Sequence, residues 1–182
     1  MASLKALRRT AWLRRQVPDG ESVADHTFGV VYWAWYVITS QAPDADPCRV
    51  LQMALVHDLH EARLGDLDAI QQALLGNDAI RQGELRAIRE LVDEMPGQLG
   101  IVYAGLMAEF LAGETEAAKI VADCDYIDFL STLLAYLPTG NQQVSALARD
   151  LHPYRVKSNV ARPIIDDLLI QIAQRVQNKG MT

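Results

Sequence analysis

The hydrophobic positions of this 182-residue chain recur at helical spacing along almost its whole length. Apolar residues three and four positions apart form stripes, and the alternation of β-branched residues that marks strands is rare. This pattern predicts helices over about 3–15, 22–41, 47–64, 78–94, 97–111 and 114–137, a short helix after 141, and a last helix over 160–178. The sequence therefore indicates an all-α fold, a bundle of about eight to nine helices.

Start and stop signals place several of these helix ends. Ser22 and Asp25 have the spacing of a capping box, in which the two side chains bond each other's backbone N–H groups. Asp46 before Pro47 puts an N-cap residue ahead of a proline at the first helical position. Gly65 is expected to end the helix that begins there.

No repeat, low-complexity stretch or long linker divides the chain. We therefore expect one domain over residues 1–182. Its motif-bearing core should span about residues 9–130, with C-terminal helices over 141–179 packed on that core. Turn signals at Pro18-Asp19-Gly20 and at 138–141 separate helices within this domain.

The composition narrows the classes of partner. A net charge of −6 argues against a protein that grips a DNA or RNA polymer, which needs many Lys and Arg side chains. No apolar run reaches the ~18–20 residues that span a bilayer, and no signal peptide is expected at the N-terminus. The two cysteines, Cys48 and Cys124, lack the spacing of a metal site, so we expect packing thiols in a reduced, cytoplasmic protein.

Histidine and carboxylate side chains recur where the expected helices could converge. His26 lies near the start of the second helix, and His57 and Asp58 are adjacent near the end of the third. Asp125 lies in a strongly apolar helix, where a buried carboxylate without a partner is costly. Imidazole and carboxylate groups that meet at one point suit a divalent ion wedged between helices. The residues alone leave two interpretations open, a metal site and ordinary core or surface positions.

These residues belong to three blocks, which in chain order are Glu21-Ser22-Val23-x-Asp25-His26, Ala54-Leu55-Val56-His57-Asp58-x-x-Glu61-x-x-x-Gly65-Asp66 and Ala118-Lys119-x-Val121-x-x-x-Asp125. Together the blocks resemble the HD-domain phosphohydrolases, and more narrowly the bacterial 5'-deoxynucleotidases and their eukaryotic HD-domain relatives. The resemblance implies one divalent metal ion held by His26, His57, Asp58 and Asp125. Mn, Co, Fe, Ni and Zn suit such ligands, and Mg suits them less well.

The same resemblance implies roles for two acids. Glu61 lies four residues after His57 and three after Asp58, on the same helical face, and would be an acid/base or water-orienting residue. Asp66 would shape the nucleotide pocket or assist proton transfer. Without the resemblance, Glu61 reads as a solvated acid near a helix end and Asp66 as a turn residue.

An N-terminal segment, Arg9-Thr10-x-Trp12-x-x-Arg15, adds a fourth block. Its spacing from His26 resembles that of the family elements that contact the substrate phosphate and sugar. This implies that Arg9, Trp12 and Arg15 bind the substrate, and a guanidinium fork matches phosphate oxygens well. The chain departs from the bacterial 5'-deoxynucleotidases at Ala11, where those enzymes have an arginine.

The activity implied by the resemblance is that of a metal-dependent phosphomonoesterase, similar to the 5'-nucleotidases, that releases phosphate from (deoxy)nucleoside 5'-monophosphates. Two alternatives stay open. The same scaffold could act on nucleoside triphosphates or another small phosphate ester, because a fold does not fix a substrate. A non-catalytic nucleotide-binding module is the other alternative, but it predicts missing ligands.

Two apolar surfaces point to self-association. The aromatic run over 32–36 goes round its helix, so some rings should face the core and others an interface. The last expected helix is amphipathic, with apolar residues at Ile164, Ile165, Leu168, Leu169, Ile172 and Val176. Because family members are often dimers, we expect a homodimer. For the last helix we favour packing inside the chain, with a dimer interface as the alternative.

Overall fold

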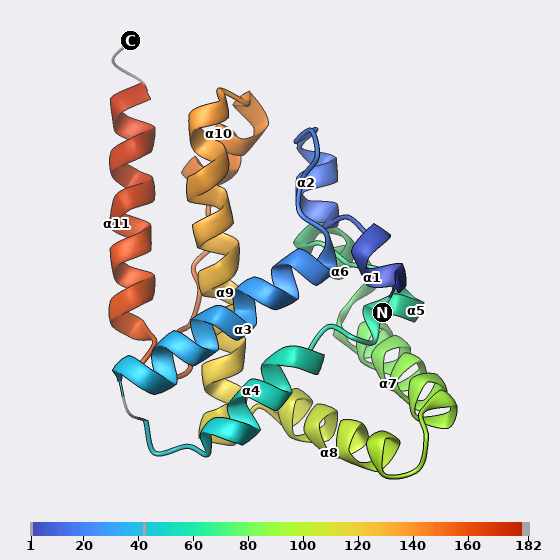
Figure 1. The fold of residues 1–182 in the computed structure, drawn as a ribbon. Coiled ribbons are helices and arrows are strands. Elements are labelled where there is room, and N and C mark those ends of the chain that lie inside the picture. The colour runs from blue at the N-terminus through green and yellow to red at the C-terminus, as the bar shows by residue number, and fades with distance from the viewer. Residues whose placement is uncertain (1, 42, 180–182) are drawn as a thin grey trace.

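The computed structural model describes residues 2–41 and 43–179, which fold into helices joined by short turns (Figure 1). The α-helices are α1 (Ala2–Ala6), α2 (Thr10–Arg14), α3 (Val23–Ser40), α4 (Pro47–Val56), α5 (Glu61–Leu64), α6 (Ala69–Leu75), α7 (Asn77–Glu94), α8 (Gln98–Ala112), α9 (Glu116–Tyr136), α10 (Gln142–Arg149) and α11 (Arg162–Lys179). A short 3₁₀ turn over Leu137–Thr139 follows α9. The all-α prediction is confirmed, with more helices than expected because several are only four or five residues long.

The capping signals act as expected. The Ser22 side chain accepts from the Asp25 backbone N–H, and the Asp25 side chain accepts from that of Ser22, so the predicted capping box starts α3. Asp46 caps α4 through the backbone N–H of Cys48, with Pro47 at the first helical position. These caps fix where α3 and α4 begin.

The prediction of one helix over 3–15 is wrong, because the backbone is not helical between α1 and α2. The backbone N–H of Arg9 donates to the carbonyl of Glu21, and that of Val23 donates to the carbonyl of Leu7. These bonds pair an extended stretch with the segment before α3 and place Arg9 just ahead of α2. α6 was not predicted either, although Asp68 and Gln71 form a capping box at its start.

The helix expected from Pro47 to Gly65 is also interrupted. α4 ends at Val56, and the next N–H groups bond carbonyls three residues back, as in Leu59 to Val56 and Glu61 to Asp58, both at 3.0 Å. Bonds of this span wind the chain more tightly than an α-helix does. His57 and Asp58 therefore lie in a turn between α4 and α5, and the short α5 ends at Gly65 with φ +84°.

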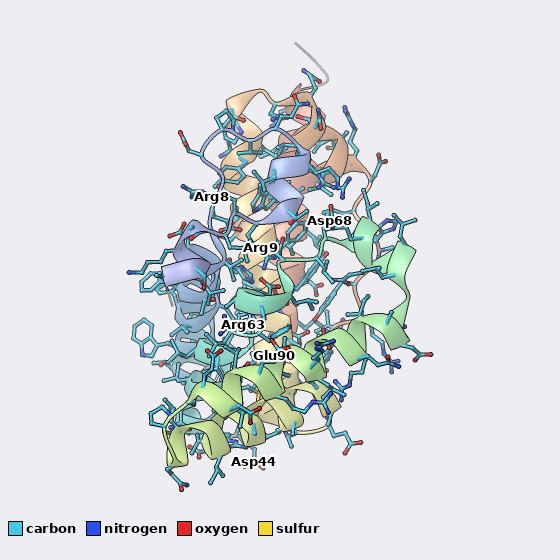
Figure 2. The ribbon with its side chains drawn as sticks, turned by 90° about the vertical axis from the view of Figure 1, so that its right-hand side faces the viewer. Arg8, Arg9, Asp44, Arg63, Asp68 and Glu90 are labelled. Carbon is cyan, nitrogen blue, oxygen red and sulfur yellow. The ribbon has the colours of Figure 1, made fainter. Side chains whose placement is uncertain are left out.

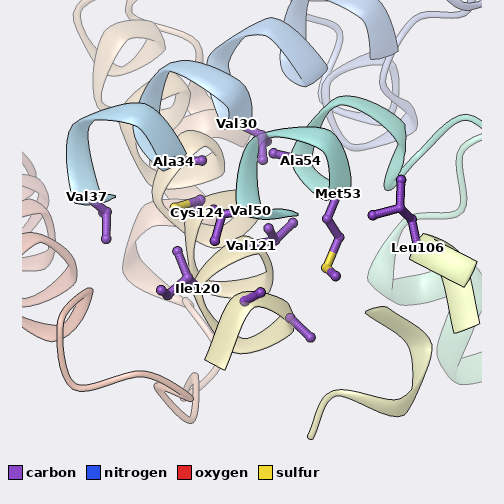
Figure 3. Packing of buried hydrophobic residues seen from close by; sticks show 12 residues of the cluster. Val30, Ala34, Val37, Val50, Met53, Ala54, Leu106, Ile120, Val121 and Cys124 are labelled. Carbon is purple, nitrogen blue, oxygen red and sulfur yellow. The ribbon is translucent and has the colours of Figure 1, made fainter. Parts of the chain in front are cut away.

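α9 is the central helix, and two hydrophobic clusters share it. Its first half packs against α3, α4 and α8 in a cluster of fully buried side chains shown in Figure 3, among them Val30, Val50, Met53, Leu106 and Val121. Its second half packs against α10 and α11, which lie beside it in Figure 1. A third cluster joins α7 and α8. The apolar face of α11 is thus partly occupied within the chain, through Ile165, Leu168 and Ile172.

Among the described helices, none combines the length and apolar content that crossing a membrane requires.

Candidate metal centre and substrate cavity

Three of the predicted ligands converge where the start of α3 meets the turn after α4. One ligand atom from each of His26, His57 and Asp58 lies within 4.8 Å of the others. Oδ2 of Asp58 lies 3.6 Å from Nε2 of His26 and 3.2 Å from Nε2 of His57. Both imidazole rings are fully buried, with 0% exposure. The three donors therefore surround one point at which the two Nε2 atoms meet a carboxylate.

The hydrogen bonds at the other ring nitrogens decide which nitrogen of each histidine is free. Nδ1 of His57 lies 2.8 Å from the carbonyl oxygen of Ala54, and Nδ1 of His26 lies 2.7 Å from Oδ2 of Asp128. Both partners only accept, so each Nδ1 carries the hydrogen. Neither Nε2 forms a well-aligned hydrogen bond within the described residues. Nε2 of each ring is thus the nitrogen left to bind a cation beside Asp58, and two such buried nitrogens fit a divalent ion.

Asp125 approaches the same point from α9. Its Oδ1 lies 3.1 Å from Nε2 of His26, and its side chain is 41% exposed. It is not part of the tight group formed by the other three ligands, but it touches that group through His26. The structure therefore brings all four predicted ligands to one place, with Asp125 on the open side.

The electrostatics of this place favour positive charge. Burial and Arg9 oppose protonation of His26, but Asp125 and Asp128 outweigh them and raise its pKa to about 10. Burial opposes ionisation of Asp58, yet His57 and His26 hold its pKa below the usual range. Carboxylates around both rings thus stabilise a cation at the Nε2 atoms, whether protons or a metal ion supply the charge.

The two acids after the His57-Asp58 pair differ in their surroundings. Burial, followed by the charges of Asp58 and Asp66, raises the pKa of Glu61 to about 10, and its Oε2 is buried without a hydrogen-bond partner in the described residues. Asp66 is 8% exposed, and its side chain accepts from the backbone N–H of Thr10. Glu61 therefore keeps a free carboxyl oxygen, whereas Asp66 ties the start of α2 to the loop before α6.

Arg9 lies between the carboxylates of the candidate metal site and a neighbouring cavity. Its Nη1 lies 3.4 Å from Oδ2 of Asp58, and its Nε lies 3.7 Å from Oδ1 of Asp66. In Figure 2 it lies between α2 and α5, whereas its neighbour Arg8 lies at the edge of the molecule. Arg9 also lines a cavity of about 220 Å³. The lining of that cavity includes Ala11, Arg15, Leu67, Phe129 and Leu147.

A family model described as HD domain matches residues 1–164. The chain belongs to this HD-domain family. It is similar to the 5'-deoxynucleotidase HDDC2 of Dictyostelium discoideum, with 25% identity over 93% of this chain and 90% of the relative.

Solved structures share the fold. A conserved hypothetical protein from Pyrococcus furiosus superposes with a TM-score of 0.71 at 24% identity, over 95% of both chains. A protein from Magnetospirillum magnetotacticum, described as a predicted metal-dependent phosphohydrolase, superposes with a TM-score of 0.65 at 22% identity, over 93% of this chain and 88% of that one. The HD-domain fold is therefore common to these chains.

Within this HD domain, Trp12 lies behind the cavity. It is 1% exposed, its ring stacks on Phe129 with centroids 5.5 Å apart, and its indole N–H donates to Glu21 at 2.7 Å. The predicted contact of Trp12 with a substrate remains a prediction. The ring supports Phe129, a cavity residue that the sequence analysis missed because its aromatic side chain resembles any other apolar position of α9.

Arg15 is the other predicted phosphate-binding residue. Its Nη1 donates to the carbonyl of Ala11 at 2.7 Å, and its side chain lines the same cavity as Arg9. The two arginines thus reach the cavity from the start and the end of α2. The cavity therefore has two arginines beside the apolar side chains of Phe129, Leu67 and Leu147. Asp68 also lines it, and the Asp68 carboxylate is paired with Arg14.

Proposed function

We propose that this HD-domain chain is a metal-dependent phosphomonoesterase that releases phosphate from (deoxy)nucleoside 5'-monophosphates. The observation that carries the proposal is the pair of buried Nε2 atoms of His26 and His57, which face Asp58 beside an arginine-lined cavity. The name of the Dictyostelium relative, a 5'-deoxynucleotidase, supports a nucleotide substrate. The name of the Magnetospirillum neighbour supports metal-dependent hydrolysis.

His26, His57, Asp58 and Asp125 would hold the metal ion. When bound, a divalent ion supplies Lewis-acid polarisation of the phosphoryl group and a more acidic water. Two imidazoles and two carboxylates suit Mn, Co, Fe, Ni or Zn better than Mg, which prefers oxygen ligands alone.

Arg9 and Glu61 are the residues that we propose for the chemistry. The Arg9 guanidinium, held by Asp58 and Asp66, would bind oxygens of the phosphate and offset their charge. Glu61, whose Oε2 is unpaired, would hold or move a proton at that oxygen, taking it from a water or giving it to the leaving 5'-oxygen. Asp66 would act on the substrate through the placement of Arg9 and α2.

The cavity supports a nucleoside as the leaving group. Phe129, Leu67 and Leu147 give it an apolar wall on which a base and sugar could pack, while Arg15 lies on the phosphate side together with Arg9. A small alkyl phosphate ester would leave this wall uncovered. We therefore expect the phosphate of a nucleotide to lie at Arg9 and its nucleoside to lie toward Phe129.

Phosphate release from nucleoside mono-, di- and triphosphates and from a simple alkyl phosphate tests this function. Protein stripped of metal with a chelator and reloaded with Mn²⁺ or Co²⁺ should hydrolyse 5'-monophosphates and lose that activity when stripped again. Activity confined to triphosphates, or to the alkyl phosphate, would overturn the substrate assignment.

A matched pair of variants tests the site. Asp58→Ala should lose both bound metal and activity, whereas Asp44→Ala, an exposed acid between α3 and α4, should keep both. Retention of metal and full activity by Asp58→Ala would show that the site lies elsewhere.

We also propose that the chain forms a homodimer through α3. Its exposed aromatic residues, Phe28, Tyr32, Trp35 and Tyr36, have helical spacing on one face, and Phe28 is 75% exposed. No charged residue occurs between 27 and 43, so two copies of this face could meet without burying charge. A reduced, cytoplasmic setting is part of the same proposal, since it suits the free thiols of Cys48 and Cys124.

A further inference from the structure

Each of the two ring nitrogens of His26 contacts a carboxylate, and both carboxylates come from one helix. Asp125 and Asp128 lie three residues apart on α9, which puts them on the same side of that helix. Oδ1 of Asp125 lies 3.1 Å from Nε2 of His26, and Oδ2 of Asp128 lies 2.7 Å from Nδ1. His57 differs, because a main-chain carbonyl holds its Nδ1. Only His26 depends on a side chain for its orientation.

Gly29 makes room for that side chain. A Cβ atom at position 29 would lie 1.9 Å from Oδ1 of Asp128 and 2.6 Å from its Cγ, far inside any real contact. Gly29 lies one turn after His26 inside α3, where glycine costs about 1 kcal/mol relative to alanine. Its φ is not positive, so the backbone does not require glycine. The packing of Asp128 against α3 does require it.

We infer that Asp128 is a positioning residue for metal binding, which holds the Nδ1–H of His26 so that Nε2 faces the ion, and that Gly29 provides the space this needs. A carboxylate behind a ligating imidazole fixes its tautomer and ring orientation and makes the ligating nitrogen more basic. Asp128 has 7% exposure and His26 has none, so little water is available to replace this bond. The inference rests on the proposed function, because it takes His26 as a metal ligand.

Glu21 offers a competing interpretation of the same contacts. Ligand atoms of Glu21, His26 and Asp128 lie within 4.8 Å of one another, a grouping that could hold a second ion. Both oxygens of Glu21 already accept hydrogen bonds, Oε1 from Trp12 at 2.7 Å and Oε2 from Thr132 at 3.2 Å. Oδ2 of Asp128 accepts from His26. Since donors of the protein already satisfy these carboxylate oxygens, the geometry favours positioning over a second metal site.

Titration of the metal-stripped chain with Mn²⁺ tests the inference, with free Mn²⁺ followed by electron paramagnetic resonance and the fold checked by circular dichroism. Asp128→Ala should raise the Kd for Mn²⁺ about 10- to 100-fold. Asp128→Asn should weaken binding less, because its amide oxygen still accepts from Nδ1. The wild type should bind one Mn²⁺ per chain at this place.

Gly29→Ala tests the space without removing the carboxylate. It should also weaken Mn²⁺ binding, whereas Gly105→Ala should not, since a Cβ at this exposed helical glycine meets nothing within 4 Å. If Asp128→Ala does not fold, the Mn²⁺ affinities of Asp128→Asn and Gly29→Ala test the positioning role.

Unchanged Mn²⁺ affinity in the folded variants would overturn the inference, as would a fall from two bound ions to one on substitution of Asp128. Asp58→Ala distinguishes a failure of the positioning role from a failure of the proposed metal site. If it abolishes Mn²⁺ binding while the Asp128 variants bind normally, only the positioning role fails. If Asp58→Ala also binds normally, the proposed metal site fails.

Discussion

Two aspartates on α9, separated by one residue, should respond to substitution in opposite ways. Asp125 faces His26, whereas Asp123 is fully buried on another side of the helix. The Asp123 carboxylate accepts from the hydroxyl of Tyr154 at 2.9 Å and from the backbone N–H groups of Lys157 at 3.0 Å and Ser158 at 2.7 Å. It therefore fixes the segment between α10 and α11 to the central helix.

The contacts of Asp123 set the size of the effect. Each hydrogen bond to a charged group contributes about 1.5–3 kcal/mol, and the backbone N–H groups of Lys157 and Ser158 lose their acceptor in Asp123→Ala. The Tyr154 hydroxyl can still donate to the carbonyl of Ala122, which lies 3.0 Å away. Lys157 is exposed, so water can replace part of this loss. We expect a decrease in unfolding free energy of about 3–5 kcal/mol from the two backbone N–H groups that lose a charged acceptor. For a chain of this length, that lowers the Tm by about 10 °C.

Thermal unfolding with and without Mn²⁺ measures the structural role of Asp123 and the metal-binding role of Asp125 in one assay. Asp123→Ala should unfold at a lower temperature but keep the rise in Tm that Mn²⁺ produces. Asp125→Ala should unfold near the wild-type temperature and lose that rise, which at a Mn²⁺ concentration 100 times the Kd corresponds to about 2.7 kcal/mol. Asp166→Ala, on the exposed side of α11, is the control and should change stability by less than about 0.5 kcal/mol.

Two results would refute this reasoning. If Asp123→Ala unfolds within about 1 kcal/mol of the wild type, then these three hydrogen bonds do not hold the segment before α11. If Asp123→Ala loses the Mn²⁺ response and Asp125→Ala keeps it, the two tasks have been assigned to the wrong residues.

Three further predictions concern the surroundings of the site. Trp12→Phe removes the N–H that bonds Glu21, and urea titration should show a loss of about 1–2 kcal/mol; an unchanged midpoint would mean that this bond contributes nothing. Burial and the charge of Asp58 raise the pKa of Glu61 to about 10, above its unfolded value, so the stability that Glu61 contributes is full below about pH 4.5 and is lost as the pH rises toward 10. The metal-free Glu61→Gln variant should therefore gain on the wild type with rising pH, by at most about 1.4 kcal/mol per unit, and parallel curves of unfolding free energy against pH would contradict this. Trp35→Glu should sediment as a monomer where the wild type sediments as a dimer, and a monomeric wild type would refute the proposed interface.

Most helices could be predicted from the sequence because their signals are local. The capping box of α3 and the Asp46-Pro47 start of α4 lie within four residues, and both act as the pattern indicates. The break before α2 depends on bonds between residues 7–9 and 21–23, which no local pattern encodes. The tightening after Val56 is similar, since apolar spacing continues through the turn while its hydrogen bonds shorten to a span of three.

The same difference between local signals and contacts over a distance applies to the residues of the site. Its metal-ligand candidates could be named because histidine and aspartate in a motif carry chemical information by their identity. Asp128 and Gly29 could not, because each has meaning only through the other: the glycine leaves space on α3 and the carboxylate fills it from α9. One position taken alone is an acid in the interior of an apolar helix, and the other is a helical glycine with a propensity cost. The propensity cost alone does not reveal the packing, since Gly105 is also a helical glycine and a Cβ there would meet nothing within 4 Å. Only the distance from Gly29 to the Asp128 carboxylate leads to the residue behind His26.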